Sequence, residues 1–174
     1  FERSRELRES PALQAYAALV ELQPTDLDAR LRIGDTLLAM GEVQRAAVVH
    51  TAFAKHAANA GYPLRALVSM KVLEALEPQL GGLLASVAKH YAVGSPRLGR
   101  GVRMSLAELD RPLPEGFAPP PADPARAEEV GAAVSQVAVY PETIPPIPLF
   151  SELPADAFAS VLQALKLVRT RPGD

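Results

Sequence analysis

Proline is unevenly distributed along this sequence, and its distribution limits where helices and strands can form. Of the 17 prolines, 11 lie between Ser95 and Pro148. Proline lacks a backbone N–H and disfavours the helical conformation in the residue before it, so this region is expected to be extended in places. The sequence therefore divides into residues 1–94, a proline-rich connector over residues 95–146, and residues 147–174.

Residues 1–94 have the pattern of consecutive helices. The few prolines in this part occur where a helix should begin or end. Gly41, Gly61 and Gly94 follow helical stretches, where glycine readily takes the left-handed conformation that ends a helix. Because the breaks are short, successive helices should be antiparallel. The predicted helices are 11–22 with Ser10 as N-cap, a second helix that starts after Thr25 or Asp26 and stops at Gly41, then 42–59, 63–76 and 80–91.

The composition excludes several kinds of function. A formal charge of -2 in 174 residues is unlike a protein that binds nucleic acid by neutralising phosphates. The absence of Cys excludes thiolate chemistry and zinc sites with Cys ligands, and the three His do not converge on a metal site. No stretch approaches the roughly 18 apolar residues of a membrane span, and no signal-peptide pattern is present, so a cytoplasmic protein is expected.

One spacing of a small residue, a bulky residue, a further apolar residue and a proline occurs twice within residues 1–94. A small side chain lets two helices approach closely, and the bulky one, a turn later, fills the space beside it. The two copies are Ala12, Tyr16, Leu19 and Pro24, and Ala66, Met70, Leu73 and Pro78. A complementary pattern is formed by Arg30, Ile33, Gly34 and Leu37, with weaker copies at Phe53, Ala54 and Ala57 and at Val87, Ala88 and Tyr91.

Over about residues 11–94 these patterns resemble the tetratricopeptide repeat family. The resemblance implies an all-α solenoid of helical hairpins with a concave face that binds a segment of another protein. Pro24 and Pro78 are separated by neither one nor two of the ~34-residue family repeats. The helix over 42–59 is therefore expected to belong to two successive hairpins. An ordinary helical bundle is the alternative.

By resemblance to the family, the partner-binding groove lies on the predicted helix that ends at Gly41. Its core stripe would be Ile33, Leu37 and Met40, with Gly34 at a close approach. The neighbouring face carries the candidate partner-binding residues Asp28, Leu31, Arg32, Asp35 and Leu38. This mixture of charged and apolar side chains favours a mixed or apolar peptide, and lacks the Lys and Asn pattern with which the family binds a terminal carboxylate. The alternative is a solvated helix surface.

The connector contains one further predicted helix, over residues 124–138. Asp123 precedes it as a capping residue, and the helix is expected to pack on the preceding helices or to bind a partner. Arg97, Arg100 and Arg103 lie among glycines without the pattern of a nucleotide-binding loop, so they indicate a flexible, solvated basic hinge.

Residues 147–174 resemble the start of a cyclic-nucleotide-binding domain. The order of elements is a Pro-Leu-Phe turn at 148–150, an amphipathic helix over 154–166 with Pro154 at its first position, a short strand over 167–171 and a Pro-Gly-Asp turn at 172–174. The apolar stripe of the helix is Phe158, Val161, Leu162 and Leu165. The family's phosphate-binding Glu and Arg would lie beyond residue 174, so no nucleotide site is expected in this chain. The alternative is an ordinary amphipathic helix.

No catalytic residue, metal ligand set or cofactor site is predicted, because no Ser, His and acidic residue share a catalytic motif and no carboxylate pair stands out. The expected function is therefore a cytoplasmic scaffold that binds a protein or peptide partner, within a larger regulatory protein, without nucleic acid or membrane contact. The alternative is a cyclic-nucleotide-responsive sensor whose helices serve self-association as a homo-oligomer. A purely structural bundle is a third possibility.

Overall fold

The computed structural model describes residues 2–76, 82–100, 111–136 and 140–168. The fold of these residues is all-α. The helices are α1 (Glu2–Leu22), α2 (Leu27–Met40), α3 (Val43–Asn59), α4 (Pro63–Leu76), α5 (Gly82–Tyr91), α6 (Pro124–Ala132), the 3-10 helices η3 (Ala133–Gln136) and η4 (Phe150–Glu152), and α7 (Ala155–Ala164).

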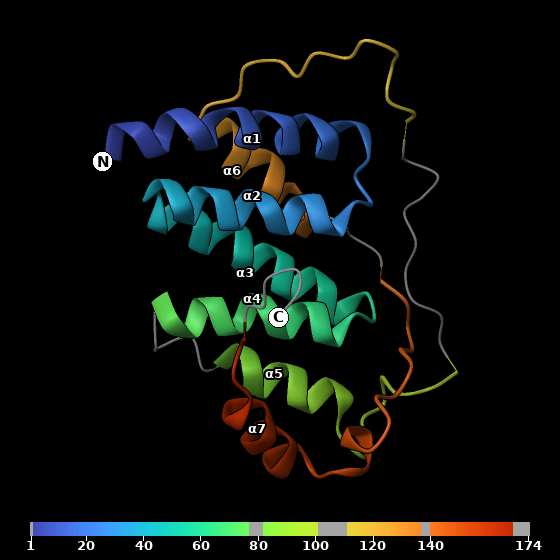
Figure 1. Ribbon diagram of the computed structural model, residues 1–174. Helices are drawn as coiled ribbons and strands as arrows, with labels where there is room; N and C mark the ends of the chain where they lie inside the picture. The colour runs from blue at the N-terminus through green and yellow to red at the C-terminus, as the bar shows by residue number, and fades with distance from the viewer. Residues whose placement is uncertain (1, 77–81, 101–110, 137–139, 169–174) are drawn as a thin grey trace.

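Helices α1 to α5 pack in chain order, each against the next, and we call them the stack. In Figure 1 they lie one below another, from α1 at the top to α5. The central helix α3 packs against both α2 and α4. The predicted boundaries of α2 and α4 are confirmed, because their signals are local. The Asp26 carboxylate accepts a hydrogen bond from the Ala29 N–H at 2.8 Å, and Gly41 and Gly61 end their helices at φ 90°.

The first helix begins earlier than predicted. Ser10 is not its N-cap, because α1 starts at Glu2 and continues through Pro11. Glu, Arg and Leu, which favour helices, dominate the residues before Pro11, and a proline removes only one N–H from the helical ladder. The helix therefore tolerates an internal proline that the sequence pattern assigned to its first turn.

The described parts of the proline-rich connector lie beside the stack, and the returning part runs along it from α6 toward α7 (Figure 1). The connector leaves α5, reaches the end of α1, and forms α6, which packs behind the stack against α1, α2 and α3. The chain then returns to α7, which packs on α5. The outgoing and returning segments meet at a parallel β-bridge between Leu98 and Ile144. The connector therefore packs on the stack through α6 and near the β-bridge, whereas its described residues 111–121 are exposed.

Three predictions for the second half need correction. The helix predicted over 124–138 is α-helical only to Ala132 and tightens into the 3-10 helix η3, a common way for a last turn to close, while residues 137–138 lie outside the described residues. Helix α7 ends at Ala164, and Pro154 is its N-cap with extended ψ, not its first residue. Leu167 and Val168 are exposed and form no strand, since no described segment pairs with them, and residues 169–171 of the predicted strand lie outside the described residues.

The buried side chains form two clusters that share α3. The first joins α1, α2, α3 and α6, and the second joins α3, α4, α5 and α7. Ile33, Leu37, Ala66 and Leu73 are all 0% exposed, as their repeat positions predicted. The predicted stripe on α1 is shifted by one residue: Ala12, Tyr16 and Leu19 are half-buried, whereas Leu13, Ala17 and Val20 fill the core.

Candidate interaction surfaces

The predicted binding face of α2 lies opposite the start of α4. The Arg65 guanidinium donates to the Asp28 carboxylate at 2.8 Å and 3.4 Å. The Asp28 side chain is nevertheless 78% exposed, and that of Arg65 is 40% exposed. Both groups are therefore accessible to charged side chains of a partner. Because exposed ion pairs of this kind contribute little to stability, replacing this pair by contacts to a partner would cost the fold little.

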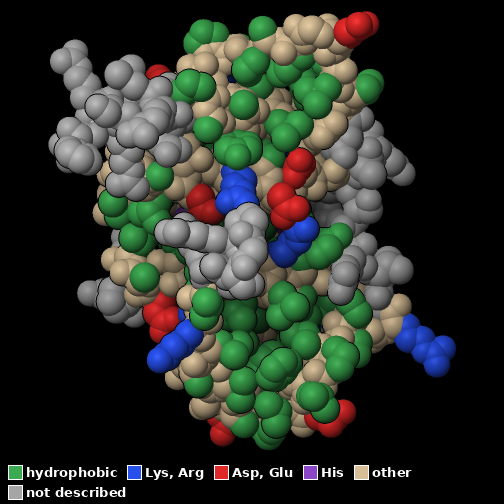
Figure 2. Space-filling model, viewed as in Figure 1, with side chains coloured by type: hydrophobic (Ala, Val, Ile, Leu, Met, Phe, Trp, Pro, Cys, Tyr) green, Lys and Arg blue, Asp and Glu red, His purple; other side chains and the backbone are tan. Residues whose placement is uncertain are grey.

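The other charged residues of this face form a pair along α2. Arg32 lies 3.8 Å from Asp35, one turn further on, and its side chain is 63% exposed. Figure 2 shows acidic and basic side chains close together across the middle of this side of the molecule, with hydrophobic side chains above and below them. This face, which we call the charged face, consists of Asp28, Arg32, Asp35 and Arg65.

The two leucines predicted for the same face are partly buried. Leu31 packs against the second cluster, and Leu38 packs against the first. The structure therefore separates the five predicted residues: Asp28 and Arg32 are exposed, Asp35 is partly buried above His50, and the leucines lie at the edges of the core. The apolar part of a binding surface has to come from elsewhere.

Beneath the charged face, a line of polar groups joins three helices. The Asp35 carboxylate lies 3.9 Å from His50 Nε2, and His50 Nδ1 lies 3.2 Å from the Ser69 hydroxyl. His50 and Ser69 are both 0% exposed, so their hydrogen bond joins α3 to α4 in the interior, while the Asp35 side chain of α2 stays 22% exposed above it. Gly34 makes room for the imidazole, because a Cβ there would lie 2.8 Å from His50 Nε2.

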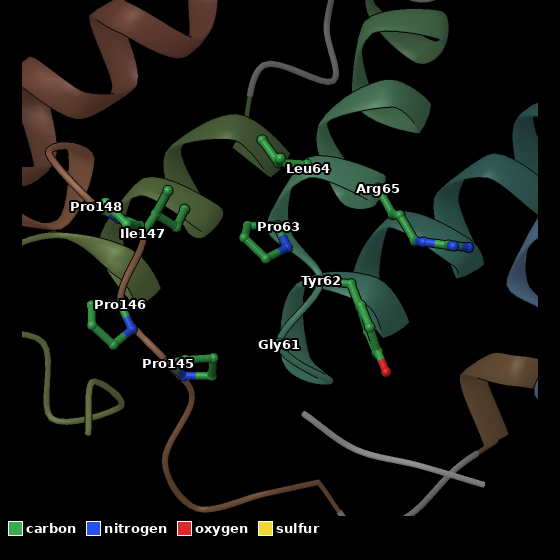
Figure 3. A pocket seen from close by; sticks show the side chains of 9 residues that line it. All are labelled: Gly61, Tyr62, Pro63, Leu64, Arg65, Pro145, Pro146, Ile147 and Pro148. Atoms are coloured by element: carbon green, nitrogen blue, oxygen red, sulfur yellow. The ribbon is translucent and has the colours of Figure 1, made fainter. Parts of the chain in front are cut away.

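A pocket of about 310 Å³ adjoins the charged face at Arg65. Its walls are the turn before α4, the first residues of α4, and the returning segment Pro145–Pro148. In Figure 3 the rings of Pro63, Pro145 and Pro146 lie around the space, while Arg65 points away from the proline segment. Leu64, at the rim, is 66% exposed. The pocket therefore offers apolar walls next to paired charges.

On the opposite side, the groove between α1, α2 and α3 is filled by α6. Arg30 of α2 is only 5% exposed, and its Nη1 donates to the carbonyl oxygen of Val130 at 2.9 Å and to that of Gly131 at 3.4 Å. These carbonyls lie at the C-terminal end of α6, where the helix dipole favours a cation. Burial lowers the pKa of Arg30 to about 10, and Asp26 acts against this shift.

Small residues bring α6 close to the stack. Ala127 is 0% exposed, and a Cβ added to Gly131 would lie 3.0 Å from the Val49 side chain. At the rim, Arg45 pairs with Glu128 at 2.6 Å, which raises the pKa of Arg45, and Arg126 pairs with Glu21. The stack thus holds this helix by a buried cation, close packing and rim charges.

The returning segment is fixed by a second buried contact. His56 Nδ1 lies 3.2 Å from the Tyr140 hydroxyl, and the two rings are tilted with centroids 5.6 Å apart. Burial, together with the smaller effect of the nearby Arg30 charge, lowers the pKa of His56 to about 4. Arg97, predicted to be solvated, is half-buried instead and donates to the carbonyl oxygens of Asn59 and Pro141 at 3.2 Å each.

Among the described residues, no three His, Asp or Glu side chains converge on a possible metal position. No described helix has the length and apolar character needed to cross a membrane. Comparison of the chain with protein-family models, with curated proteins and with solved structures finds no match.

The helix that begins at Pro124 was expected to pack on the preceding helices or to bind a partner, and it packs on α1, α2 and α3, but the groove that holds it was not predicted. Its one available signal was Arg30, a charged residue in the same repeat pattern as the buried Ile33, Gly34 and Leu37. A buried cation needs hydrogen-bond acceptors, and carbonyl oxygens of α6 supply them to Arg30.

Proposed function

We propose that this protein is a cytoplasmic interaction module that binds a segment of a partner protein across the charged face and the adjoining pocket. In this proposal α1 to α5 are a short solenoid of the tetratricopeptide type. One observation supports it most strongly: the stack already holds α6, a helix about 100 residues away along the chain from Arg30, through side-chain recognition of its backbone and through close packing.

The charged face and the pocket favour a segment of mixed character. Arg32 and Arg65 can pair with acidic side chains, and Asp28 with a basic one, because all three are exposed. The pocket volume of about 310 Å³ and its proline walls suit an apolar side chain of the same segment. A bound segment would thus place an apolar anchor beside Leu64 and its charges along α2.

The second candidate is a cyclic-nucleotide-responsive sensor. It is supported by the order of η4 and α7 after the Pro145–Pro148 segment, which resembles the opening of that domain family without the expected strand at Leu167 and Val168. The helices would then serve self-association. Titration of the full gene product with cAMP and cGMP tests this candidate, since a response to neither nucleotide contradicts it.

Selection of peptides from a random display library against the full chain tests the interaction proposal. We expect an enriched motif with an apolar anchor flanked by charges, whose binding falls at least tenfold in Arg65→Glu and in Arg32→Glu. Lys55→Glu on α3 is the matched control, because Lys55 is exposed and lies outside both surfaces. Failure to enrich any motif, or equal binding to all three variants, contradicts the proposal.

A further inference from the structure

The chain consists of two parts that bind each other. The stack and the segment that leaves it, up to Arg100, form the first part. The second part, which we call the arm, is described over residues 122–136 and 140–168 and contains α6 and α7. Their interface extends along the whole stack, because α6 packs on α1, α2 and α3 while α7 packs on α5.

Specific contacts fix the arm at each level of the stack. Gly99 and Ile144 share a backbone hydrogen bond of 3.1 Å at the β-bridge, and Val93 donates to the Leu153 carbonyl oxygen at 2.9 Å. Lys71 of α4 donates to the Gln163 carbonyl oxygen at 2.9 Å. With the Arg30 and His56 contacts above, these bonds determine where each element of the arm lies.

The arm has no core that would hold its two helices together. Among the described residues, α6 belongs to the first cluster and α7 to the second, and the two helices are not packed against one another. The arm therefore acquires its structure by docking on a stack. Nothing in these contacts requires that the stack belong to the same chain.

The segment before the arm, residues 111–121, which we call the link, contributes little to this interface. Every residue from Arg111 to Pro121 is exposed. The Arg111 N–H donates to the Leu22 carbonyl oxygen at 2.7 Å, at the end of α1. Five of these residues are prolines, at 112, 114 and 119–121, so the link is a semi-rigid extended spacer that resists compaction.

From this arrangement we propose that the arm is exchanged between two copies of the chain, giving a dimer in which each stack holds the other copy's α6 and α7. Both states bury the same surfaces between a stack and an arm, and they differ in which copy of the chain supplies the arm. The ratio of exchanged dimer to monomer then depends on two concentrations. One is the protein concentration, and the other is the effective concentration at which the link holds the arm near its own stack. The groove behind α1, α2 and α3 is thus an interface for a second copy.

Cleavage of the link distinguishes an exchanged dimer from any other dimer. Part of the link is replaced, residue for residue, by the recognition sequence of a site-specific protease. Isotope-labelled and unlabelled chains are mixed, unfolded and refolded together at about 1 mM, in the range of effective concentrations of short linkers. We expect a dimer which, after cleavage, falls to half its mass as complexes of a labelled stack with an unlabelled arm. No dimer, or a dimer that survives cleavage, overturns the proposal.

A second experiment leaves the link unaltered and uses the Arg45–Glu128 pair. In Arg45→Glu, and separately in Glu128→Arg, like charges meet within one chain. When the two variants are refolded together, exchange restores opposite charges in both grooves. We expect a 1:1 heterodimer by native mass spectrometry, at several times the dimer fraction of either variant alone. A mixture with no more dimer than its components overturns the proposal, and Lys55→Glu mixed with wild type is the control.

Discussion

Arg30 Nη1 donates to the carbonyl oxygen of Val130, so a cation on α2 caps a helix that follows about 100 residues later in the chain. The same side chain donates through Nε to the Pro24 carbonyl oxygen at 3.2 Å. One buried guanidinium therefore joins the turn before α2, α2 itself and the end of α6. No neighbouring carboxylate is hydrogen-bonded to it in the described contacts, and carbonyl oxygens act as its acceptors.

Replacing Arg30 with Met should destabilise the protein by about 2–3 kcal/mol, because it leaves buried carbonyl oxygens without donors. The free energy of unfolding in urea measures this change. Arg32→Met is the matched control on the same helix, and should stay within about 0.5 kcal/mol of wild type, since Arg32 is largely exposed. Equal effects of the two substitutions contradict a capping role for Arg30.

Gly34→Ala should destabilise the fold by about 1–3 kcal/mol through overpacking, because the new Cβ would meet the His50 ring. The larger Gly34→Leu should cost more. Gly82→Ala is the control, since no atom lies within 4 Å of a Cβ there. In a His50→Ala background the cost of Gly34→Ala should largely disappear, and additive effects of the two substitutions would show that the ring is not what limits the space.

Stability should fall with pH between about 6.5 and 4. The folded-state pKa of His56 is about 4, below the ordinary 6.5, so the unfolded chain binds a proton in this window while the folded protein does not. The contribution, present above pH 6.5, is about 3 kcal/mol and is lost as the pH falls. Burial also lowers the pKa of His90, which acts in the same direction.

Urea unfolding at pH 7 and pH 4.5 measures this dependence, with His56→Asn as the comparison. The variant should lose most of the difference between the two pH values while remaining folded at pH 7. An identical pH dependence in wild type and variant would assign the effect to other groups.

Asp28→Lys should change stability by less than about 1 kcal/mol, because its ion pair with Arg65 is exposed. Its effect on a selected peptide should be larger, since it reverses the charge at one end of the charged face. The charge-exchanged variant with Asp28→Arg and Arg65→Asp should keep wild-type stability and still bind the peptide differently. Thermal unfolding and titration of the labelled peptide measure the two effects separately.

Short-range signals in the sequence predicted much of the stack. Asp26 and Gly41 determine the ends of α2 through contacts within a few residues, so their roles can be read without knowledge of the fold. The buried repeat positions Ile33 and Leu37 are likewise evident from helical spacing. On α1, by contrast, both Ala12 and Leu13 fit an apolar stripe, and the choice depends on how α6 and α2 pack around it.

The contacts that dock the arm could not be predicted in the same way, although α6 was expected either to pack on the preceding helices or to bind a partner. They depend on residues far apart in the sequence, such as Arg45 and Glu128, and neither is unusual in its local context. The proline content indicated an extended connector, and its exposed link fits that expectation. The positions of α6 and α7 depend on surfaces of the stack, and these surfaces exist only after the stack has folded.

Helix α3 supplies Ala46 and Val49 to one cluster, and Phe53 and Ala57 to the other. Neither cluster can lose its packing while the other keeps an intact α3, so heating should melt the molecule in a single cooperative transition in spite of its elongated succession of helices. A destabilising substitution at either end of α3 would therefore lower the melting temperature of the whole protein, including the cluster that it does not touch.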